Sequence, residues 1–246
     1  MKAETGNVIT VDALHKSFGS QEVLKGVSFT LGQKENLVVL GKSGSGKSVL
    51  IKCIVGLMFP DSGTVDVMGN DMPSLPIKEL NEVRKRIGFL FQSAALYDSM
   101  SVRQNLEFPL RRVKKEKNKK VIDEKVEEVL ANVNLADAID KMPSQLSGGM
   151  RKRIGLARTL IMNPEILLYD EPTTGLDPLT SIEICELINE VQKKYESAAI
   201  IITHDPKVVQ LTSNRLLIVR DGIITAEGTY DVLRKSEDEW VHAFLN

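Results

Sequence analysis

Hydrophobic residues follow two different patterns along this chain of 246 residues. Apolar and polar residues alternate over 8–29 and 64–67, which predicts antiparallel strands with one buried face. Unbroken apolar runs at 37–40, 166–169 and 198–202 are typical of parallel strands that are buried on both faces. The two patterns predict two sheets of different kinds.

The hydrophobic spacing becomes helical from about residue 93 to 163, and strands and helices alternate again afterwards. One apolar stripe at helical spacing lies inside this segment and consists of Ile122, Val126, Val129, Leu130 and Val133. We interpret the stripe as subdomain core rather than as a partner site. We therefore predict one α/β domain over 7–245, with an antiparallel β subdomain. Its doubly wound core comes from 7–92 and 164–245, and 93–163 forms an inserted helical subdomain.

Eight consecutive residues after the first parallel strand match the pattern G-x-x-x-x-G-K-[ST]: Gly41, Lys42, Ser43, Gly44, Ser45, Gly46, Lys47 and Ser48. The glycines allow backbone N–H groups to approach phosphate oxygens. Lys47 would reach the β- and γ-phosphates, and the Ser48 hydroxyl would hold Mg²⁺. A helical pattern over 48–55 follows, and a helix N-terminus favours anions. A glycine-rich turn that binds nothing is the alternative, but the strand before and the helix after favour an ATP or GTP site.

The apolar run at 166–169 ends in two acids, Asp170 and Glu171. Asp170 would support the Mg²⁺, and Glu171 is placed to polarise an attacking water molecule. A carboxylate at the end of a buried strand needs a cation or hydrogen-bond donors, because unpaired burial is costly. The alternative is an acidic strand end that caps a turn before Pro172, and the glycine-rich loop makes this less favoured.

Three single residues are weaker candidates. Gln92 follows the apolar run 87–91, where an amide could contact both the metal and the water, although such a glutamine is usually solvated. His204 follows 198–203 at another strand exit and could contact the γ-phosphate, although a lone histidine is more often structural. Phe18 could stack on an adenine ring, although a lone aromatic residue is more often part of the core.

A second glycine-rich loop, Leu146-Ser147-Gly148-Gly149-Met150, lies far from the first in the sequence. A nucleotide hydrolase needs only one phosphate loop for each nucleotide. Two loops in one chain indicate that each nucleotide is held from both sides by two copies of the protein, so that ATP joins them reversibly.

In their order along the chain, these elements resemble the ATP-binding-cassette (ABC) ATPase family over about 7–245. The resemblance identifies the first loop as the Walker A loop, the strand ending at Glu171 as Walker B, and 146–150 as the family signature. Four further positions match the A-loop, the Q-loop, the D-loop and the switch histidine of the family: Phe18, Gln92, Asp177 and His204.

The resemblance implies a head-to-tail homodimer with two ATP molecules and Mg²⁺ at its interface. The Walker A loop of one subunit would face the signature of the other, so that Ser147, Gly148 and Gly149 bind the γ-phosphate across the interface, beside Met150 and Asp177. The resemblance also implies that Lys47, Glu171 and His204 are catalytic and that Ser48, Gln92 and Asp170 are near the metal. Each cycle of closure and reopening would move an integral membrane permease subunit.

One departure from the family pattern is informative. Most members have glutamine at the fifth signature position, whereas this chain has Met150, followed by Arg151-Lys152-Arg153. This run resembles the ATPase of MCE-type (Mla-like) phospholipid transporters, and so do 41–50 and 96–102. The resemblance therefore implies phospholipid transport and an additional lipid-binding MCE-type partner. Methionine should leave the phosphate contacts intact, since serine and backbone N–H groups make them.

Composition limits the other classes of function. A formal net charge of −1 argues against bulk nucleic-acid binding. Cys53 and Cys185 fall in predicted helices without metal-ligand spacing, which indicates two free thiols in a cytosolic protein. No apolar stretch approaches the roughly 18 residues of a membrane span, and 1–10 lack a signal-peptide pattern. We therefore expect a cytoplasmic protein on the inner face of the membrane, with another chain supplying the membrane path.

Two surfaces are candidates for coupling to that membrane partner. A basic run interrupted by Glu116 could face acidic lipid headgroups or be a solvated connector: Arg111, Arg112, Lys114, Lys115, Lys117, Lys119 and Lys120. Residues 95–98 follow Gln92, where family members form a groove for a helix of the membrane subunit. We prefer the second surface.

Three other readings stay open. The ATPase of an amino-acid or metal importer or of a drug exporter would share every catalytic motif. A soluble ABC protein acting on ribosomes or in DNA repair normally has two cassettes or a long coiled-coil insertion, which this chain does not show. A regulatory module without turnover would have lost the catalytic acid, whereas Glu171 is present.

Overall fold

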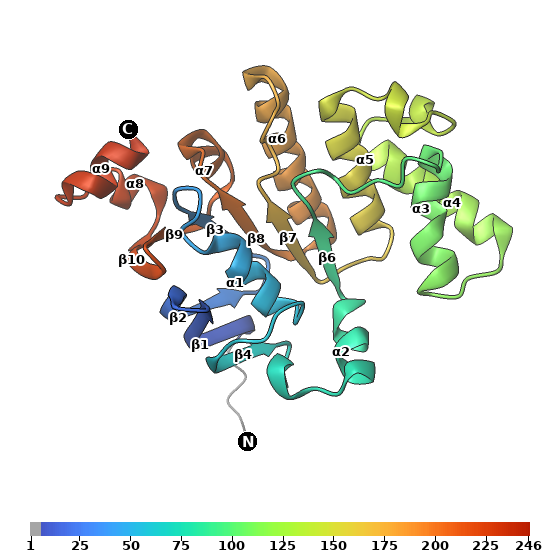
Figure 1. Cartoon of the computed structure of the whole chain (residues 1–246). Coiled ribbons are helices and arrows are strands. Elements are labelled where there is room, and N and C mark those ends of the chain that lie inside the picture. The colour runs from blue at the N-terminus through green and yellow to red at the C-terminus, as the bar shows by residue number, and fades with distance from the viewer. Residues whose placement is uncertain (1–5) are drawn as a thin grey trace.

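A computed structural model describes residues 6–246 (Figure 1). Residues 1–5, which form half of the segment without a signal-peptide pattern, lie outside the described part. The chain folds into two sheets with helices around them. The antiparallel sheet has the order β2-β1-β4-β5, with strands β1 (Asn7–Phe18), β2 (Gln21–Gly32), β4 (Ser62–Val67) and β5 (Asn70–Asp71). This confirms the antiparallel strands that the alternating pattern predicts.

The second sheet has six strands in the order β10-β9-β3-β8-β7-β6. These are β3 (Asn36–Leu40), β6 (Ile87–Leu90), β7 (Ile166–Asp170), β8 (Ala198–Thr203), β9 (Arg215–Arg220) and β10 (Ile223–Gly228). The neighbouring pairs run parallel, except that β10 pairs antiparallel with β9. All residues of β3 and β8 are buried, as the unbroken apolar runs predict.

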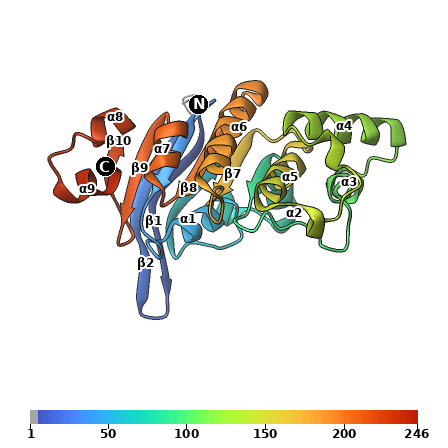
Figure 2. The same ribbon diagram turned by 90° about the horizontal axis from the view of Figure 1, so that it is seen from above.

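Helices surround the second sheet and fill the segment between β6 and β7. Their bounds are α1 (Lys47–Ile54), α2 (Ile77–Arg84), α3 (Val102–Arg112), α4 (Lys119–Asn132), α5 (Gly148–Leu160), α6 (Pro178–Tyr195), α7 (Pro206–Thr212), α8 (Tyr230–Leu233) and α9 (Glu239–Leu245). Figures 1 and 2 show α3, α4 and α5 at one end of the molecule and α8 with α9 at the other. None of the helices in the described part has the length and apolar composition that crossing a membrane requires.

Strand β3 separates two hydrophobic cores. Leu37 and Val39 point to the core that α1 and the antiparallel sheet complete, whereas Val38 and Leu40 point to the core of α5, α6 and α7. Successive side chains of a strand face opposite ways, so a buried run can supply two cores at once. The central strands β3 and β8 are therefore covered on both faces, whereas the edge strand β10 is partly exposed.

An ion pair joins the two sheets at the edge where β3 begins. Arg215 Nε donates to Glu35 Oε1 at 2.7 Å, and Arg215 Nη2 donates to the Thr30 carbonyl at 2.6 Å. The Gly32 N–H donates to Glu35 Oε2 at 2.7 Å. Burial alone would raise the pKa of Glu35, but the hydrogen bonds from Arg215 and Gly32 hold that pKa below its ordinary value. This network fixes β2 of the first sheet against β3 and β9 of the second.

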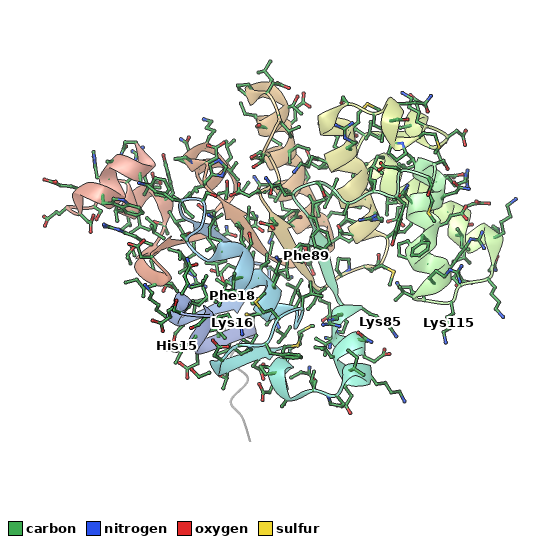
Figure 3. The ribbon with its side chains drawn as sticks, in the orientation of Figure 1. His15, Lys16, Phe18, Lys85, Phe89 and Lys115 are labelled. Carbon is green, nitrogen blue, oxygen red and sulfur yellow. The ribbon has the colours of Figure 1, made fainter. Side chains whose placement is uncertain are left out.

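The apolar stripe of the helical segment is buried, which confirms that it is core. It packs with α3 and α5, and Figure 2 shows these helices gathered beside α4. The basic run lies at the end of α3, in the connector and at the start of α4, with its lysines and arginines exposed; Figure 3 labels Lys115 at this outer end. The boundaries of the inserted subdomain stay a prediction. Cys53 and Cys185 are buried and free, as expected.

Candidate nucleotide site

The first glycine-rich loop connects β3 to α1, as the sequence predicts. Gly44 and Gly46 have φ angles of +83° and +100°, a region that favours glycine. A Cβ atom on Gly46 would lie 2.9 Å from the Val23 carbonyl oxygen, and one on Gly41 would lie 2.5 Å from the Val219 carbonyl oxygen. The loop is therefore held so closely by β2 and β9 that larger residues do not fit at these two positions. Its backbone leads into the N-terminus of α1, where N–H groups lack helical partners.

Lys47 is the first residue of α1 and is only 6 % exposed. Its ammonium donates to the carbonyl oxygens of Gly41 at 2.6 Å and Lys42 at 2.9 Å. Burial lowers the pKa of Lys47, while Glu171 and Asp170 act in the opposite direction. The cation is thus held over the loop, at the place where a phosphate chain would meet the loop N–H groups.

Ser48 and Asp170 supply oxygen atoms of the kind that Mg²⁺ prefers. Ser48 Oγ donates to Asp170 Oδ1 at 3.4 Å, although the two residues are far apart in sequence. Burial raises the pKa of Asp170, and the neighbouring Glu171 charge adds to this rise. Within residues 6–246, no group of three or more His, Cys, Asp and Glu side chains could hold a metal. The donor set fits Mg²⁺ bound by one carboxylate, one hydroxyl and phosphate oxygens.

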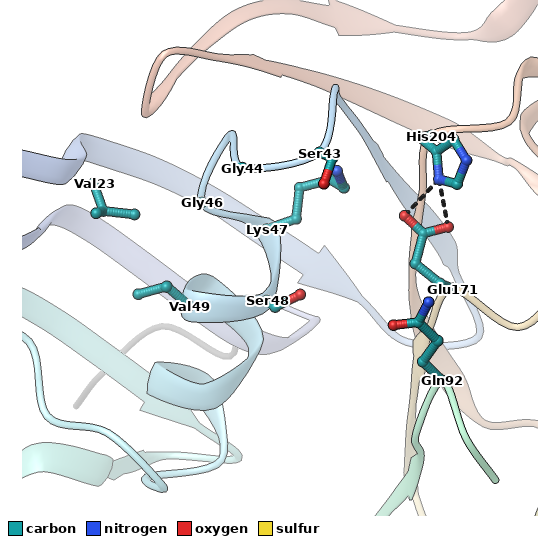
Figure 4. A pocket seen from close by; sticks show the side chains of 10 residues that line it. All are labelled: Val23, Ser43, Gly44, Gly46, Lys47, Ser48, Val49, Gln92, Glu171 and His204. Carbon is teal, nitrogen blue, oxygen red and sulfur yellow. Dashed lines mark hydrogen bonds and ion pairs between the residues drawn. The ribbon is translucent and has the colours of Figure 1, made fainter. Parts of the chain in front are cut away.

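Glu171 and His204 meet at the ends of β7 and β8. His204 Nδ1 lies 2.9 Å from both Glu171 carboxylate oxygens (Figure 4). The Glu171 side chain is 13 % exposed, and Thr174 Oγ1 also donates to it at 3.3 Å. The Glu171 backbone has φ +50°, a left-handed conformation that is uncommon outside glycine. Its N–H is held by the Ile202 carbonyl at 2.9 Å.

Lys47, Ser48, Glu171 and His204 line one pocket of about 290 Å³, whereas Asp170 does not line it and contacts Ser48 at its edge. Its lining residues come from β2, the glycine-rich loop, α1 and the ends of the parallel strands: Val23, Ser43, Gly44, Gly46, Lys47, Ser48, Val49, Gln92, Glu171 and His204. Figure 4 shows Lys47 and Ser48 on one side of the pocket and Gln92, Glu171 and His204 on the other. The structure therefore brings together the loop and three side chains that the sequence picks from separate strand exits.

Phe18 does not line this pocket but lies at the end of β1, 48 % exposed. Lys16 Nζ is 5.8 Å from the centre of its ring, and Figure 3 shows both residues on the β1–β2 side of the molecule. An exposed aromatic face at the tip of β1 is open to a planar ligand. Its role in stacking on adenine stays a prediction.

The second glycine-rich loop lies outside the pocket of its own chain. Ser147 Oγ accepts from the Met150 N–H at 3.2 Å and so caps α5, which begins at Gly148. A Cβ atom on Gly149 would lie 2.5 Å from Thr180 Cγ2, so the loop packs closely on α6. Asp177 caps α6 by accepting from the Thr180 N–H at 3.0 Å. The signature and Asp177 thus lie side by side, away from Lys47.

Two cations of α5 that hold the backbone after β6 and β7 are not among the residues that the sequence predicts. Lys152 is only 5 % exposed and donates to the carbonyl oxygens of Gln92 and Glu171. Arg158 donates to the carbonyl oxygens of Ala94 and Ala95. The sequence does contain one indication that Lys152 is buried. Gly155 and Leu156 follow it by three and four residues, which places Lys152 on an apolar face of its helix.

A buried strand, a glycine-rich loop, a helix that starts with a buried lysine and an acid pair on a nearby strand define a P-loop nucleoside triphosphatase. A family model described as "ABC transporter" matches residues 24–174. The chain belongs to the ABC transporter family. It is accordingly an ABC ATPase that binds ATP with Mg²⁺ and hydrolyses ATP.

Curated relatives match nearly the whole chain. A probable ribonucleotide transport ATP-binding protein, mkl, from Mycobacterium tuberculosis is 38% identical over 98% of this chain and 67% of its own length. The chloroplastic protein trigalactosyldiacylglycerol 3 from Arabidopsis thaliana is 40% identical over 94% of this chain and 71% of its own length. The methionine import ATP-binding protein MetN from Brucella abortus is 34% identical over 92% of this chain and 61% of its own length.

Two solved structures have the same fold. The dimeric post-hydrolysis ATP-binding cassette MJ0796, bound to ADP and Pi, has a TM-score of 0.81 at 29% identity and covers 90% of this chain and 98% of its own. The cbiO1 protein from Clostridium perfringens, part of an ABC transporter complex, has a TM-score of 0.84 at 27% identity and covers 97% and 98%. These structures confirm the predicted ABC ATPase fold.

Proposed function

We propose that this ATPase drives phospholipid transport through a separate integral membrane permease, together with a lipid-binding MCE-type partner. It would act as a homodimer on the cytoplasmic face of the inner membrane. The observation that carries the substrate class is Met150 in the signature, followed by three basic residues, a run that resembles the MCE-type phospholipid ATPases. The relative from Arabidopsis thaliana supports a lipid substrate more generally, since the glycolipid trigalactosyldiacylglycerol gives that protein its name.

The arrangement of the two glycine-rich loops supports the dimer. Lys47 lines the pocket, whereas Ser147 and the N-terminus of α5 lie outside it, so one chain supplies only part of the expected phosphate contacts. In a head-to-tail pair, Ser147, Gly148 and Gly149 of one subunit would contact the γ-phosphate bound by Lys47 of the other. The similar cassette MJ0796 is dimeric in its solved structure.

The residues of the pocket divide the chemistry between them. Lys47 and the glycine-rich loop would bind and neutralise the phosphate oxygens, and Phe18 would hold the base. Glu171 would orient the attacking water and accept its proton, while His204 keeps the carboxylate aimed into the pocket. When Mg²⁺ is bound by Ser48 and Asp170, near Gln92, it neutralises phosphate charge. Most of the rate would come from electrostatic stabilisation in this half-enclosed site.

A groove of about 690 Å³ between α2, β6 and α3 supports coupling to a permease. Phe91, Tyr97 and Val113 are exposed apolar residues on it, and Arg84 and Lys85 lie at one side. Figure 3 labels Lys85 and Phe89 in this region. An amphipathic helix of the permease would place its apolar face against these side chains. The groove includes Ala95 and Tyr97, within the predicted coupling segment 95–98.

The substrate is tested by purifying the tagged full chain from its own membranes and identifying the proteins and lipids that come with it. We expect an integral membrane permease, an MCE-type protein and bound phospholipid. A Tyr97→Ala, Phe91→Ala variant should lose the permease while keeping ATP binding, because neither residue lines the nucleotide pocket. A permease recovered with a soluble binding protein for an amino acid, and without phospholipid, would contradict the lipid assignment.

The relatives also favour two other substrates, which the same purification distinguishes. The mkl protein is named for ribonucleotide transport and MetN for methionine import, and they are 38% and 34% identical to this chain. A ribonucleotide or methionine that binds the purified complex more tightly than phospholipid would favour those substrates.

A further inference from the structure

Helix α5 connects the second glycine-rich loop to the catalytic pocket through one buried cation. The Lys152 ammonium donates to the Gln92 carbonyl at 2.5 Å and to the Glu171 carbonyl at 3.0 Å. The two carbonyl groups belong to different strand exits, after β6 and β7. A single side chain therefore links the backbones of two pocket residues to the helix that Ser147 caps.

The same face of α5 packs closely on the segment that follows Gln92. A Cβ atom on Gly155 would lie 2.9 Å from Ala94 Cβ, so glycine permits this approach. Arg158 donates to the carbonyl oxygens of Ala95 at 2.7 Å and Ala94 at 3.2 Å. Lys152, Gly155 and Arg158 recur every three residues, which places them along one side of the helix.

Three residues whose carbonyl groups accept from these cations have left-handed backbones. The φ angles are +50° at Glu171, +60° at Ala94 and +47° at Ala95. Residues with a Cβ atom adopt this conformation only where surrounding contacts hold them in it. At Glu171 the backbone N–H donates to the Ile202 carbonyl, and the backbone carbonyl accepts from Lys152 at 3.0 Å and from the Thr174 N–H at 3.3 Å. Lys152 is thus one of the groups that hold the backbone conformation in which the Glu171 carboxylate meets His204.

We propose that Lys152 is a positioning residue for ATP hydrolysis: its buried ammonium fixes the backbones of Glu171 and Gln92 and ties both to α5. The inference rests on the role of Glu171 in the proposed function. A purely structural residue at this position would be better apolar, because burying an ammonium group is costly. The hydrogen bonds from the Lys152 ammonium to the Gln92 and Glu171 carbonyl groups offset this cost. If α5 moves when a second subunit binds, Lys152 would therefore shift the backbone of Glu171 and with it the catalytic carboxylate.

The test compares Lys152→Met and Lys152→Gln with the unchanged chain in steady-state ATPase assays. Methionine has similar length but no donor, so kcat should fall about 10- to 100-fold, the effect of losing hydrogen bonds from a charged group. The KM for ATP should stay within about threefold, since Lys47 and the glycine-rich loop are untouched. The glutamine amide has two N–H donors and should restore kcat at least about threefold above the methionine variant.

Arg153→Met is the matched control on the same helix. Arg153 pairs with Glu183 at 2.8 Å and contacts no pocket residue, so its loss should alter the melting temperature without lowering kcat. If Lys152→Met fails to fold, the test uses Lys152→Gln alone. Its kcat should then be at least threefold below that of the unsubstituted chain, with the same KM for ATP.

An unchanged kcat in a folded Lys152→Met variant, or a raised KM at constant kcat, would overturn the inference. Glutamine no better than methionine would overturn it too. If the chain without any substitution released no phosphate, that result would instead contradict the proposed roles of the pocket residues. A failure of the Lys152 inference and a failure of the proposed function are therefore distinguishable.

Discussion

Replacing Glu171 by glutamine tests the chemistry of the pocket most simply. The amide has the shape of the carboxylate and can still pair with His204, whose Nδ1 lies 2.9 Å from both carboxylate oxygens. It cannot accept a proton from water. The loss of one group that acts in the transition state typically costs about 10²–10³ in rate, or about 2.7–4 kcal/mol. Because the phosphate contacts of Lys47 and the glycine-rich loop stay in place, ATP binding should change little.

Two assays on the Glu171→Gln chain separate binding from chemistry. Phosphate release should fall by at least 100-fold, while equilibrium dialysis gives an ATP affinity close to that of the unchanged chain. Sedimentation with ATP and Mg²⁺ should show a dimer that persists, since the nucleotide that joins the subunits is no longer hydrolysed. Phosphate release at the normal rate would remove Glu171 from its assigned role. A lost ATP affinity would mean that the carboxylate serves binding.

Three further changes test separate parts of the structure. Phe18→Ala should raise the KM for ATP about fivefold or more with kcat unchanged, because base stacking contributes about 1–3 kcal/mol; an unchanged KM would exclude stacking. Gly155→Ala should cost about 1–3 kcal/mol of unfolding free energy through the 2.9 Å approach to Ala94, while Gly6→Ala, with no atom within 4 Å, should cost nothing measurable. Glu35→Gln should cost about 1–3 kcal/mol at pH 7 by weakening the link to Arg215. Arg215 and Gly32 hold the pKa of Glu35 in the folded protein below its value in the unfolded chain. The difference in unfolding free energy between the two proteins should therefore be fully present above the unfolded pKa and vanish as the pH falls through the folded pKa. A difference that does not depend on pH would refute the role given to the Glu35 carboxylate.

The parts of the site that the sequence predicts are those fixed by short segments. The glycine-rich loop is readable because the backbone at Gly44 and Gly46 requires glycine and because a strand and a helix flank it. Gln92, Glu171 and His204 are readable because each follows an apolar run, and the carboxyl ends of parallel strands meet at one edge of a sheet. Local chemistry and one topological rule are enough for these residues.

Contacts between distant segments are not readable in the same way. The bond from Lys152 to the Glu171 carbonyl depends on how α5 packs against the sheet, and Gly155 alone does not specify that approach. The left-handed backbone at Glu171 could not be predicted from the sequence, because the residue there is not glycine. The antiparallel pairing of β10 is also missed, because its hairpin with β9 lies within a pattern of alternating strands and helices.

The central claim is that ATP is held between Lys47 of one subunit and Ser147 of another, and a crosslink between two differently labelled chains tests it directly. Ser43→Cys and Ser147→Cys are prepared as separate proteins in the Glu171→Gln background, mixed with ATP and Mg²⁺, and treated with a short bifunctional maleimide. The native thiols should not interfere, because burial raises the pKa of Cys53 to about 11 and that of Cys185 to about 12. We predict a two-chain product that needs both proteins and ATP. No such product, or equal crosslinking within each protein alone, would contradict the shared site.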